Sequence, residues 1–102
     1  MTATAIEADL NGPAVVLEFG APWCSPCRQL EPILVELAQE YRGIRFISLD
    51  IEDEHDARIA QRFNVRSAAT VLLLRDGEVV GQFIGAQPKA TIVRHLAVLS
   101  PL

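Results

Sequence analysis

The sequence predicts an α/β fold in which helices cover both faces of a central mixed β-sheet. Strand-like and helix-like patterns alternate over residues 14–64, which favours strands joined by helical crossovers. An Asp-Gly pair then separates two strand-like runs, which indicates an antiparallel hairpin. The chain has 102 residues and no linker-like stretch or internal repeat, so we expect one domain over residues 1–102.

The first half of the chain predicts a strand followed by a long helix. Residues 14–20 are apolar nearly throughout, as in a strand that is covered on both faces. From Pro26 onward, apolar residues recur at helical spacing as far as Tyr41, and Gly43 ends the pattern. Pro32 lies inside this helix and lacks an N–H group, so we expect a kink there. We also expect a short helix over residues 1–10.

The second half predicts three strands and two helices. A strand over residues 44–51 precedes a helix that Asp53 can cap and that ends near Asn64. The hairpin follows, with strands at residues 70–74 and 78–84. Pro88 suits the first position of a closing helix whose inner face carries Ile92, Leu96 and Leu99.

Composition excludes several classes of function. Half of the residues are hydrophobic and 22% are charged, which is typical of a folded globule rather than a disordered chain. The net charge is −4 and no basic run is present, so nucleic acid is not an expected partner. The sequence has neither a signal-like amino terminus nor an apolar stretch long enough for a membrane. We therefore expect a cytoplasmic protein. Structural disulfides are rare in the cytoplasm.

The chemistry-bearing motif is Cys24-Ser25-Pro26-Cys27, at the predicted junction of the first strand and the long helix. Unpaired N–H groups at a helix N-terminus favour an anion and lower the pKa of a cysteine placed there. We therefore expect Cys24, which precedes the helix, to be the nucleophile. Cys27 lies on the apolar stripe, so we expect it to be more buried and to resolve the mixed disulfide.

The residues around the two cysteines are expected to tune them. Pro26 fixes the first helical φ and limits how far the pair can relax between dithiol and disulfide. Ser25 either caps the helix or donates toward a sulfur, and the sequence leaves both open. Arg28 either favours the thiolate through its charge or is a solvated helix residue.

Two structural interpretations of the cysteines compete with the redox one. A structural zinc site needs four ligands, but His55 and His95 are far apart and lack zinc-finger spacing, so we expect no metal. Simple packing of both cysteines in the core is also weaker, because a C-x-x-C motif beside a βα unit is typical of redox chemistry.

The run from Phe19 to Arg28, Phe-Gly-Ala-Pro-Trp-Cys-Ser-Pro-Cys-Arg, together with Pro32, resembles the thioredoxin family. The resemblance continues through residues 63–70, the hairpin at residues 75–78 and residues 84–86, and it covers roughly residues 14–99. It implies the thioredoxin fold and a thiol–disulfide oxidoreductase whose Cys24–Cys27 dithiol reduces protein disulfides. The resemblance also implies that the protein takes part in electron transport and cell redox homeostasis.

The resemblance also implies the partners. A flavin-dependent, NADPH-linked reductase would recharge the dithiol, and the chain itself would bind no cofactor and act as a monomer. By position, the loop at Ala68 and Ala69, together with Trp23 and Gly85, would dock the substrate. The alternative is a redox-weak binding or chaperone module of the same fold, because several family residues are replaced.

Four replacements lie around the predicted site. Ser25 occupies the place of the usual Gly, and Gly20 that of a Trp. Glu18 stands in place of a buried Asp, and Ser48 in place of the Lys near it. Glu18 is therefore either a buried carboxyl that exchanges a proton with Cys27 or a carboxylate that reaches solvent past Gly20.

Two further features concern substrate docking. Ala69 takes the place of a cis-proline. Because a cis bond before a non-proline residue costs about 2.5 to 4 kcal/mol, we expect the Ala68–Ala69 bond to be trans and the docking loop to be reshaped. Trp23 is either an exposed docking surface or a cap over the cysteines, and we favour docking. The acidic stretch over residues 50–56, with His55 inside it, is expected to form a solvated face.

Overall fold

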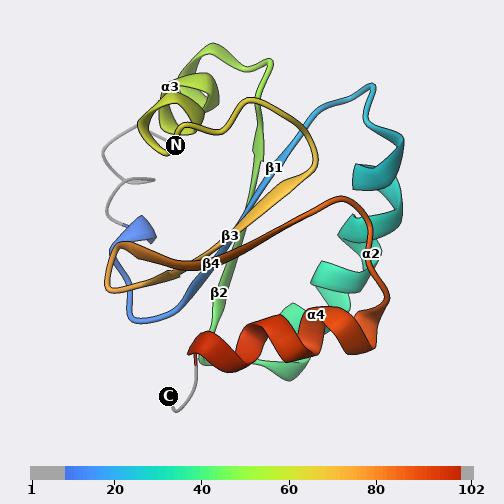
Figure 1. The fold of residues 1–102 in the computed structure, drawn as a ribbon, viewed down its shortest axis with the longest axis vertical. Coiled ribbons are helices and arrows are strands. Elements are labelled where there is room, and N and C mark those ends of the chain that lie inside the picture. Colours follow the sequence, from blue (N-terminus) through green and yellow to red (C-terminus); the bar gives the residue numbers. More distant parts are fainter. Residues whose placement is uncertain (1–8, 100–102) are drawn as a thin grey trace.

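The computed structural model describes residues 9–99 and forms a four-stranded mixed sheet with helices on both faces (Figure 1). Most of the predicted helix over residues 1–10 lies outside the described residues. The part that is described, Asp9 and Leu10, is helical. The elements in chain order are β1 (Val15–Gly20), α2 (Ser25–Glu40), β2 (Arg45–Asp50), α3 (Glu54–Arg62), β3 (Thr70–Arg75), β4 (Glu78–Ile84), α4 (Lys89–Leu96) and the 3₁₀ turn η1 (Ala97–Leu99). The predicted fold class and element order are confirmed.

The strands lie in the order β2-β1-β3-β4. β1 pairs in parallel with β2 across the α2 crossover and antiparallel with β3, and β3 pairs antiparallel with β4. The β3–β4 turn has Asp76 at φ 53° and Gly77 at φ 84°, the two positive values that the Asp-Gly pair predicted. A side chain at Gly77 would also collide with Asn11, since its Cβ would lie 2.6 Å from the Asn11 amide oxygen.

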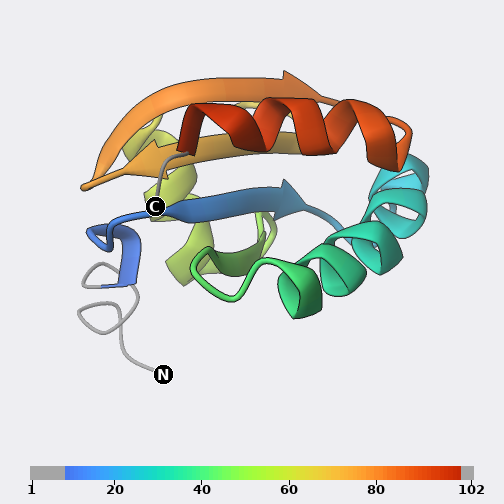
Figure 2. The ribbon, with the colours of Figure 1, turned by 90° about the horizontal axis from the view of Figure 1, so that it is seen from below.

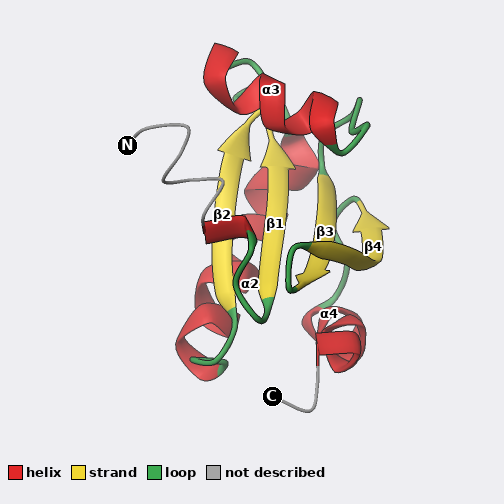
Figure 3. Ribbon diagram, turned by 90° about the vertical axis from the view of Figure 1, so that its left-hand side faces the viewer, coloured by secondary structure: helices red, strands yellow, loops and turns green. Residues whose placement is uncertain are grey.

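Alternation along the strands creates one apolar layer on each face of the sheet. Val16, Val71 and Leu73 face α2 and α4, whereas Val15, Leu17 and Leu72 face α3. Figure 2 shows α4 lying along the β3–β4 side, and Figure 3 shows α3 crossing the sheet near the arrowheads of β1 and β2. Glu18 has the same parity as Val16, so it points toward α2.

The helix ends largely follow the sequence signals. Asp53 caps α3, because its carboxylate accepts the Asp56 N–H at 3.0 Å, and Asn64 follows the helix with a positive φ of 58°. α2 runs unbroken from Ser25 to Glu40 with Pro32 inside it, and the kink at Pro32 stays a prediction. Pro88 is the N-cap of α4, one position earlier than expected. Within residues 9–99, no helix is long and apolar enough to span a membrane.

Candidate active site

Cys24 and Cys27 lie where β1 leads into α2, and they form a disulfide with a Cα–Cα distance of 5.3 Å. Cys24 is the N-cap of the helix, and its sulfur accepts the backbone N–H of Cys27 at 3.2 Å. This contact is the one that a thiolate at a helix N-terminus would use. The structure therefore places the sulfur of Cys24 at the positive end of α2, as the sequence predicted.

The expected difference in burial between the two cysteines is not seen in this disulfide form. Cys24 is 2% exposed and Cys27 is 1% exposed. The reason is that Cys24 packs in the same apolar cluster as Cys27. What does differ is their neighbours, since Cys24 is flanked by exposed residues on both sides and Cys27 lines a cavity that opens to the surface.

The residues predicted to tune the pair take distinct places. Cys24 occupies the cap position, so Ser25 is the first helical residue rather than the cap, and Pro26 follows it. Arg28 donates from its guanidinium to the carbonyl oxygen of Pro22 at 3.2 Å. Its positive charge is thereby held near the segment that leads into Cys24.

The Ala68–Ala69 peptide bond is cis, so the expectation of a trans bond was wrong. Local preference was overridden by tertiary packing. Ala69 is buried in the cluster that contains both cysteines, and its carbonyl accepts the Gly85 N–H at 2.9 Å. On the other side, the Thr70 hydroxyl donates to the Ser67 carbonyl at 2.7 Å. The structure thus brings the predicted docking loop against the disulfide.

Gly85 completes this part of the site. Its φ of 81° lies in the left-handed region, where residues with a side chain are strained. The glycine lets the chain turn directly after β4 while its N–H stays bonded to Ala69. Two segments that are distant in the sequence therefore meet next to the cysteines.

Trp23 is 60% exposed beside Cys24, which disagrees with a cap over the pair and agrees with the docking alternative. Its indole N–H donates to the carboxylate of Glu52. Sequence reasoning missed Glu52, because it lies 29 residues away in a stretch that reads as a solvated acidic face.

That acidic stretch is also more structural than expected. The Asp56 carboxylate accepts the Asp50 N–H at 3.0 Å, and the Asp50 carboxylate accepts the Glu52 N–H at 2.8 Å. Both aspartates are half-buried, and so is His55, whose Nδ1 lies 3.3 Å from Asp56. These side chains shape the turn between β2 and α3, because short acidic side chains readily accept nearby backbone N–H groups.

Glu18 is buried, with 1% of its surface exposed, so the alternative in which it reaches solvent past Gly20 was wrong. One carboxyl oxygen, Oε1, accepts the Ser48 hydroxyl at 2.8 Å. Burial is the main cause that raises the pKa of Glu18, the Ser48 hydrogen bond opposes it, and the charge of Glu31 adds to it. Glu18 thus has the environment of a carboxyl group that can hold a proton.

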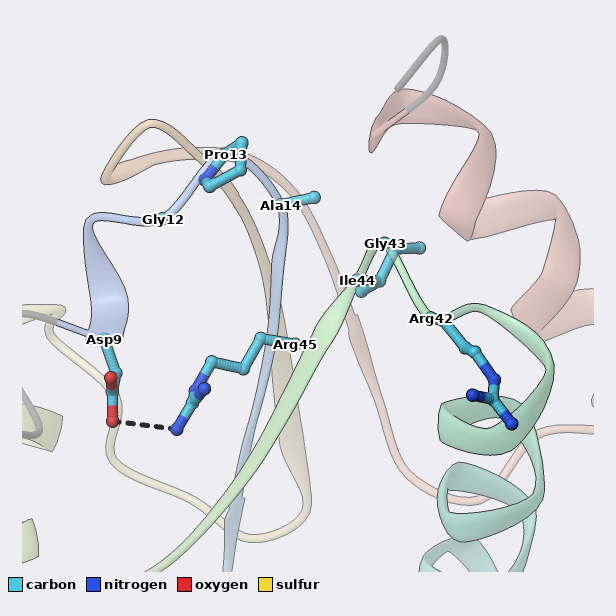
Figure 4. A pocket seen from close by; sticks show the side chains of 8 residues that line it. All are labelled: Asp9, Gly12, Pro13, Ala14, Arg42, Gly43, Ile44 and Arg45. Atoms are coloured by element: carbon cyan, nitrogen blue, oxygen red, sulfur yellow. Dashed lines mark hydrogen bonds and ion pairs between the residues drawn. The ribbon is translucent and has the colours of Figure 1, made fainter.

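Two of the cavities in the described part of the chain lie at opposite ends of β1. One, of about 360 Å³, reaches Cys27 and is also lined by Gly20, Glu31 and Ser48. The other, of about 480 Å³, lies at the start of β1 and β2, where Asp9 and Arg45 form an ion pair at 3.2 Å (Figure 4). The second cavity contains none of the predicted site residues.

A cysteine pair at a helix N-terminus, on a mixed sheet covered on both faces, defines the class of thiol–disulfide oxidoreductases. Comparison with known proteins agrees. The family model named Thioredoxin matches residues 2–98, and the chain belongs to the thioredoxin family.

Individual relatives support the same assignment. The chain is 40% identical over 83 residues to a thioredoxin of Haemophilus influenzae, covering 80% of this chain and 76% of the relative. The solved structure of mitochondrial thioredoxin 3 from Saccharomyces cerevisiae, in its oxidised form, has a TM-score of 0.77 and 31% identity over 90% of this chain and 86% of that one. Thioredoxin f2 of Chlamydomonas reinhardtii shares the fold, with a TM-score of 0.84 over 100% of this chain and 95% of the other, at 23% identity. The protein is therefore a protein-disulfide oxidoreductase.

Proposed function

We propose that the protein reduces protein disulfides, with Cys24 as the nucleophile and Cys27 as the resolving residue. The observation that carries this assignment is the contact between the Cys24 sulfur and the Cys27 N–H at the start of α2. A thiolate in that position is stabilised by the helix N-terminus, and the thiolate is the form that attacks a disulfide. Cys27 has no such cap position and faces the cavity instead.

The reaction proceeds by two exchanges. The Cys24 thiolate attacks one sulfur of the substrate disulfide, forms a mixed disulfide and displaces the first substrate thiolate. Cys27 then loses its proton and attacks the Cys24 sulfur, which forms the Cys24–Cys27 disulfide and displaces the second substrate thiolate. Two electrons have then passed to the substrate, and the protein is in the oxidised form described above.

Glu18 is proposed as the group that accepts the proton of Cys27. Three features support this role. Glu18 points toward α2, it is buried, and its pKa is raised chiefly by that burial. A carboxyl group with a raised pKa is a better proton acceptor than an ordinary one, and it can release the proton again within one cycle.

Docking of the substrate is assigned to the surface around the disulfide. Trp23 supplies an exposed apolar group on one side of Cys24. On the other side lies the loop of Ala68, Ala69 and Gly85, next to Ile84, which is 60% exposed. An extended substrate chain could pair its backbone with this loop, since unpaired peptide groups at an edge bind extended chains.

Regeneration needs a partner that supplies two electrons per cycle. We assign this to a flavin-dependent, NADPH-linked reductase, as the family resemblance implies, with the chain acting as a monomer in cytoplasmic electron transport. The reactive group that passes the electrons is the Cys24–Cys27 pair, and the proposal involves no bound cofactor.

Turnover of a protein disulfide tests the assignment. We expect the wild type to reduce insulin with dithiothreitol as electron source, and Cys24→Ser to lose this activity. Cys27→Ser should still attack and should accumulate a mixed disulfide that mass spectrometry detects, because the resolving sulfur is missing. Equal and negligible activity in wild type and Cys24→Ser would contradict the proposal and favour a redox-inactive binding module.

A further inference from the structure

Gly20 leaves a space between two reactive groups. A Cβ at this position would lie 3.3 Å from the Cys27 sulfur and 3.5 Å from Oε2 of Glu18. Both atoms therefore face the same point, which lies on the α2 side of β1. Any side chain at residue 20 would begin in this space and separate the sulfur from the carboxyl group.

This space adjoins the cavity of about 360 Å³ beside Cys27. Gly20, Cys27 and Ser48 all line that cavity, and so does Glu31, which is exposed. A water molecule occupies about 30 Å³ in the liquid, so the cavity has room for several waters. The space over Gly20 therefore adjoins an open cavity whose wall is partly polar.

Only one of the two carboxyl oxygens of Glu18 is hydrogen-bonded within the described residues. Oε1 accepts the Ser48 hydroxyl, whereas Oε2 is buried and has no hydrogen-bond partner among the described residues. Because the hydroxyl donates to Oε1, the proton of a neutral Glu18 belongs on Oε2. Buried polar atoms without a protein partner are normally satisfied by water, and Oε2 faces the space over Gly20.

Glu31 lies one helical turn after Cys27 on the same face of α2. Its charge acts on Glu18 and raises the pKa of Glu18 further, after the larger effect of burial. The other charged groups at the cavity form hydrogen bonds with the backbone. Arg28 donates to the Pro22 carbonyl, and the carboxylates of Asp50 and Asp56 accept backbone N–H groups. Glu31 is thus the acidic group of the cavity wall that remains available to exchange protons with solvent.

We propose that the space over Gly20 and its cavity form the route by which the proton of Cys27 reaches solvent, with Glu18 Oε2 at the inner end and Glu31 at the outer end. This inference rests on the proposed function, in which Cys27 resolves the mixed disulfide. It goes further by assigning positioning roles to Gly20, Glu31 and Ser48. Ser48 keeps Oε2 free for the proton, and Gly20 keeps the path open.

The proton balance of the step is closed. Cys27 gives its proton through water to the Glu18 carboxylate, and its sulfur forms a bond to Cys24 while the bond from Cys24 to the substrate sulfur breaks. The substrate thiolate leaves with the electron pair. Neutral Glu18 then returns its proton through the cavity waters, past Glu31, to solvent, and the carboxylate is ready for the next cycle.

The test separates resolution from attack. The reduced protein is mixed rapidly with a protein that contains disulfides, such as insulin. The rate at which the second substrate thiol is released is then measured from about pH 5 to pH 8. Attack by Cys24 alone is measured in the Cys27→Ser background. The variants are Gly20→Ala, which fills the space, and Glu31→Gln, with Glu36→Gln as the control on the same helix outside the cavity.

We expect Gly20→Ala to slow release of the second thiol by about tenfold or more, the scale of lost acid–base assistance, with attack by Cys24 unchanged. Glu31→Gln should move the pH at which release accelerates to lower values, because losing the like charge lowers the pKa of Glu18. Glu36→Gln should match the wild type.

Two results would overturn the route: a Gly20→Ala protein that releases the second thiol at the wild-type rate, or a Glu31→Gln profile that superimposes on that of Glu36→Gln. If Gly20→Ala does not fold, the Glu31→Gln profile decides alone. If Cys24 does not attack the substrate disulfide when residue 20 and residue 31 are unchanged, the proposed function itself is overturned.

Discussion

Among the single residues, Glu18 is the one whose chemistry depends most on where the fold places it. In an unfolded chain it would titrate near the ordinary value of 4.5. In the folded protein it is 1% exposed, and burial raises its pKa. The folded state therefore binds this proton more tightly than the unfolded state does.

The sign of the resulting pH dependence follows directly. Between pH 4.5 and the raised pKa, the folded protein keeps a proton that the unfolded chain has released, so the free energy of unfolding falls as pH rises through this window. We expect Glu18→Gln to remove that fall and to be more stable than the wild type at neutral pH. Urea unfolding at several pH values measures it, with Glu36→Gln as the control. If the free energies of unfolding of the wild type and of Glu18→Gln change with pH in parallel, the prediction is contradicted.

Ala69 shows how a residue's geometry can be decided by distant parts of the chain. Local energetics favour a trans bond before alanine, and the sequence offers nothing to oppose it. The opposing contacts come from Gly85, which lies 16 positions further along by residue number, and from the apolar cluster around the cysteines. Such contacts exist only once the sheet has formed.

Among the elements, α3 is the one whose start is most clearly marked in the sequence. It spans only nine residues, and its N-terminus is held by the side chain of Asp53 on the Asp56 N–H. A helix this short depends on capping and packing, because the cost of nucleation is spread over few hydrogen bonds.

We therefore expect Asp53→Ala to destabilise the protein by about 1 kcal/mol, the usual cost of losing an N-cap. Asp53→Asn is the matched control, since asparagine keeps an oxygen that can accept the same N–H group. The midpoint of urea unfolding measures both variants. Equal midpoints for Asp53→Ala and Asp53→Asn, both unchanged from the wild type, would mean that the cap contributes nothing.

The other important element is α2, because its first turn carries the reactive sulfur. Three local signals locate this turn: the end of an apolar strand, the two cysteines and Pro26 between them. They suffice to predict a thiolate at a helix N-terminus. Which of Cys24 and Ser25 is the cap depends on the path of the loop from Gly20, and there the hydrogen bond from the Cys24 N–H to the Ala21 carbonyl at 3.1 Å helps to shape the turn.

At the scale of the whole molecule, stability rests on two apolar layers that share one sheet. Leu37 is fully buried in the layer under α2, whereas Val35 on the same helix is 60% exposed. We expect Leu37→Ala to cost about 2 to 5 kcal/mol of unfolding free energy, through lost burial and the cavity left behind. Val35→Ala should cost less than about 0.5 kcal/mol.

Chemical denaturation of both variants checks this contrast, with the slope of each transition confirming two-state unfolding. Similar losses of unfolding free energy at the two positions would contradict the layered core. A Leu37→Ala protein that keeps the wild-type unfolding free energy would do so as well.

The sequence by itself determined the features that depend on short-range patterns. Apolar runs, helical spacing, the Asp-Gly turn and the capping residue predicted the order of the elements, and the C-x-x-C motif predicted the site of chemistry. These signals are local because backbone conformation and helix-end electrostatics are set by residues a few positions apart. The positions of Cys24, Cys27 and Asp53 could therefore be interpreted before the fold was known.

Only the tertiary structure decided the features that depend on which segments meet. The cis bond at Ala69, the hydrogen bond from Trp23 to Glu52, the complete burial of Glu18 and the space over Gly20 all arise from contacts between β1, α2, β2 and the loops around them. The physical reason is that burial, desolvation and packing are properties of a three-dimensional environment, and residues far apart in the chain create it.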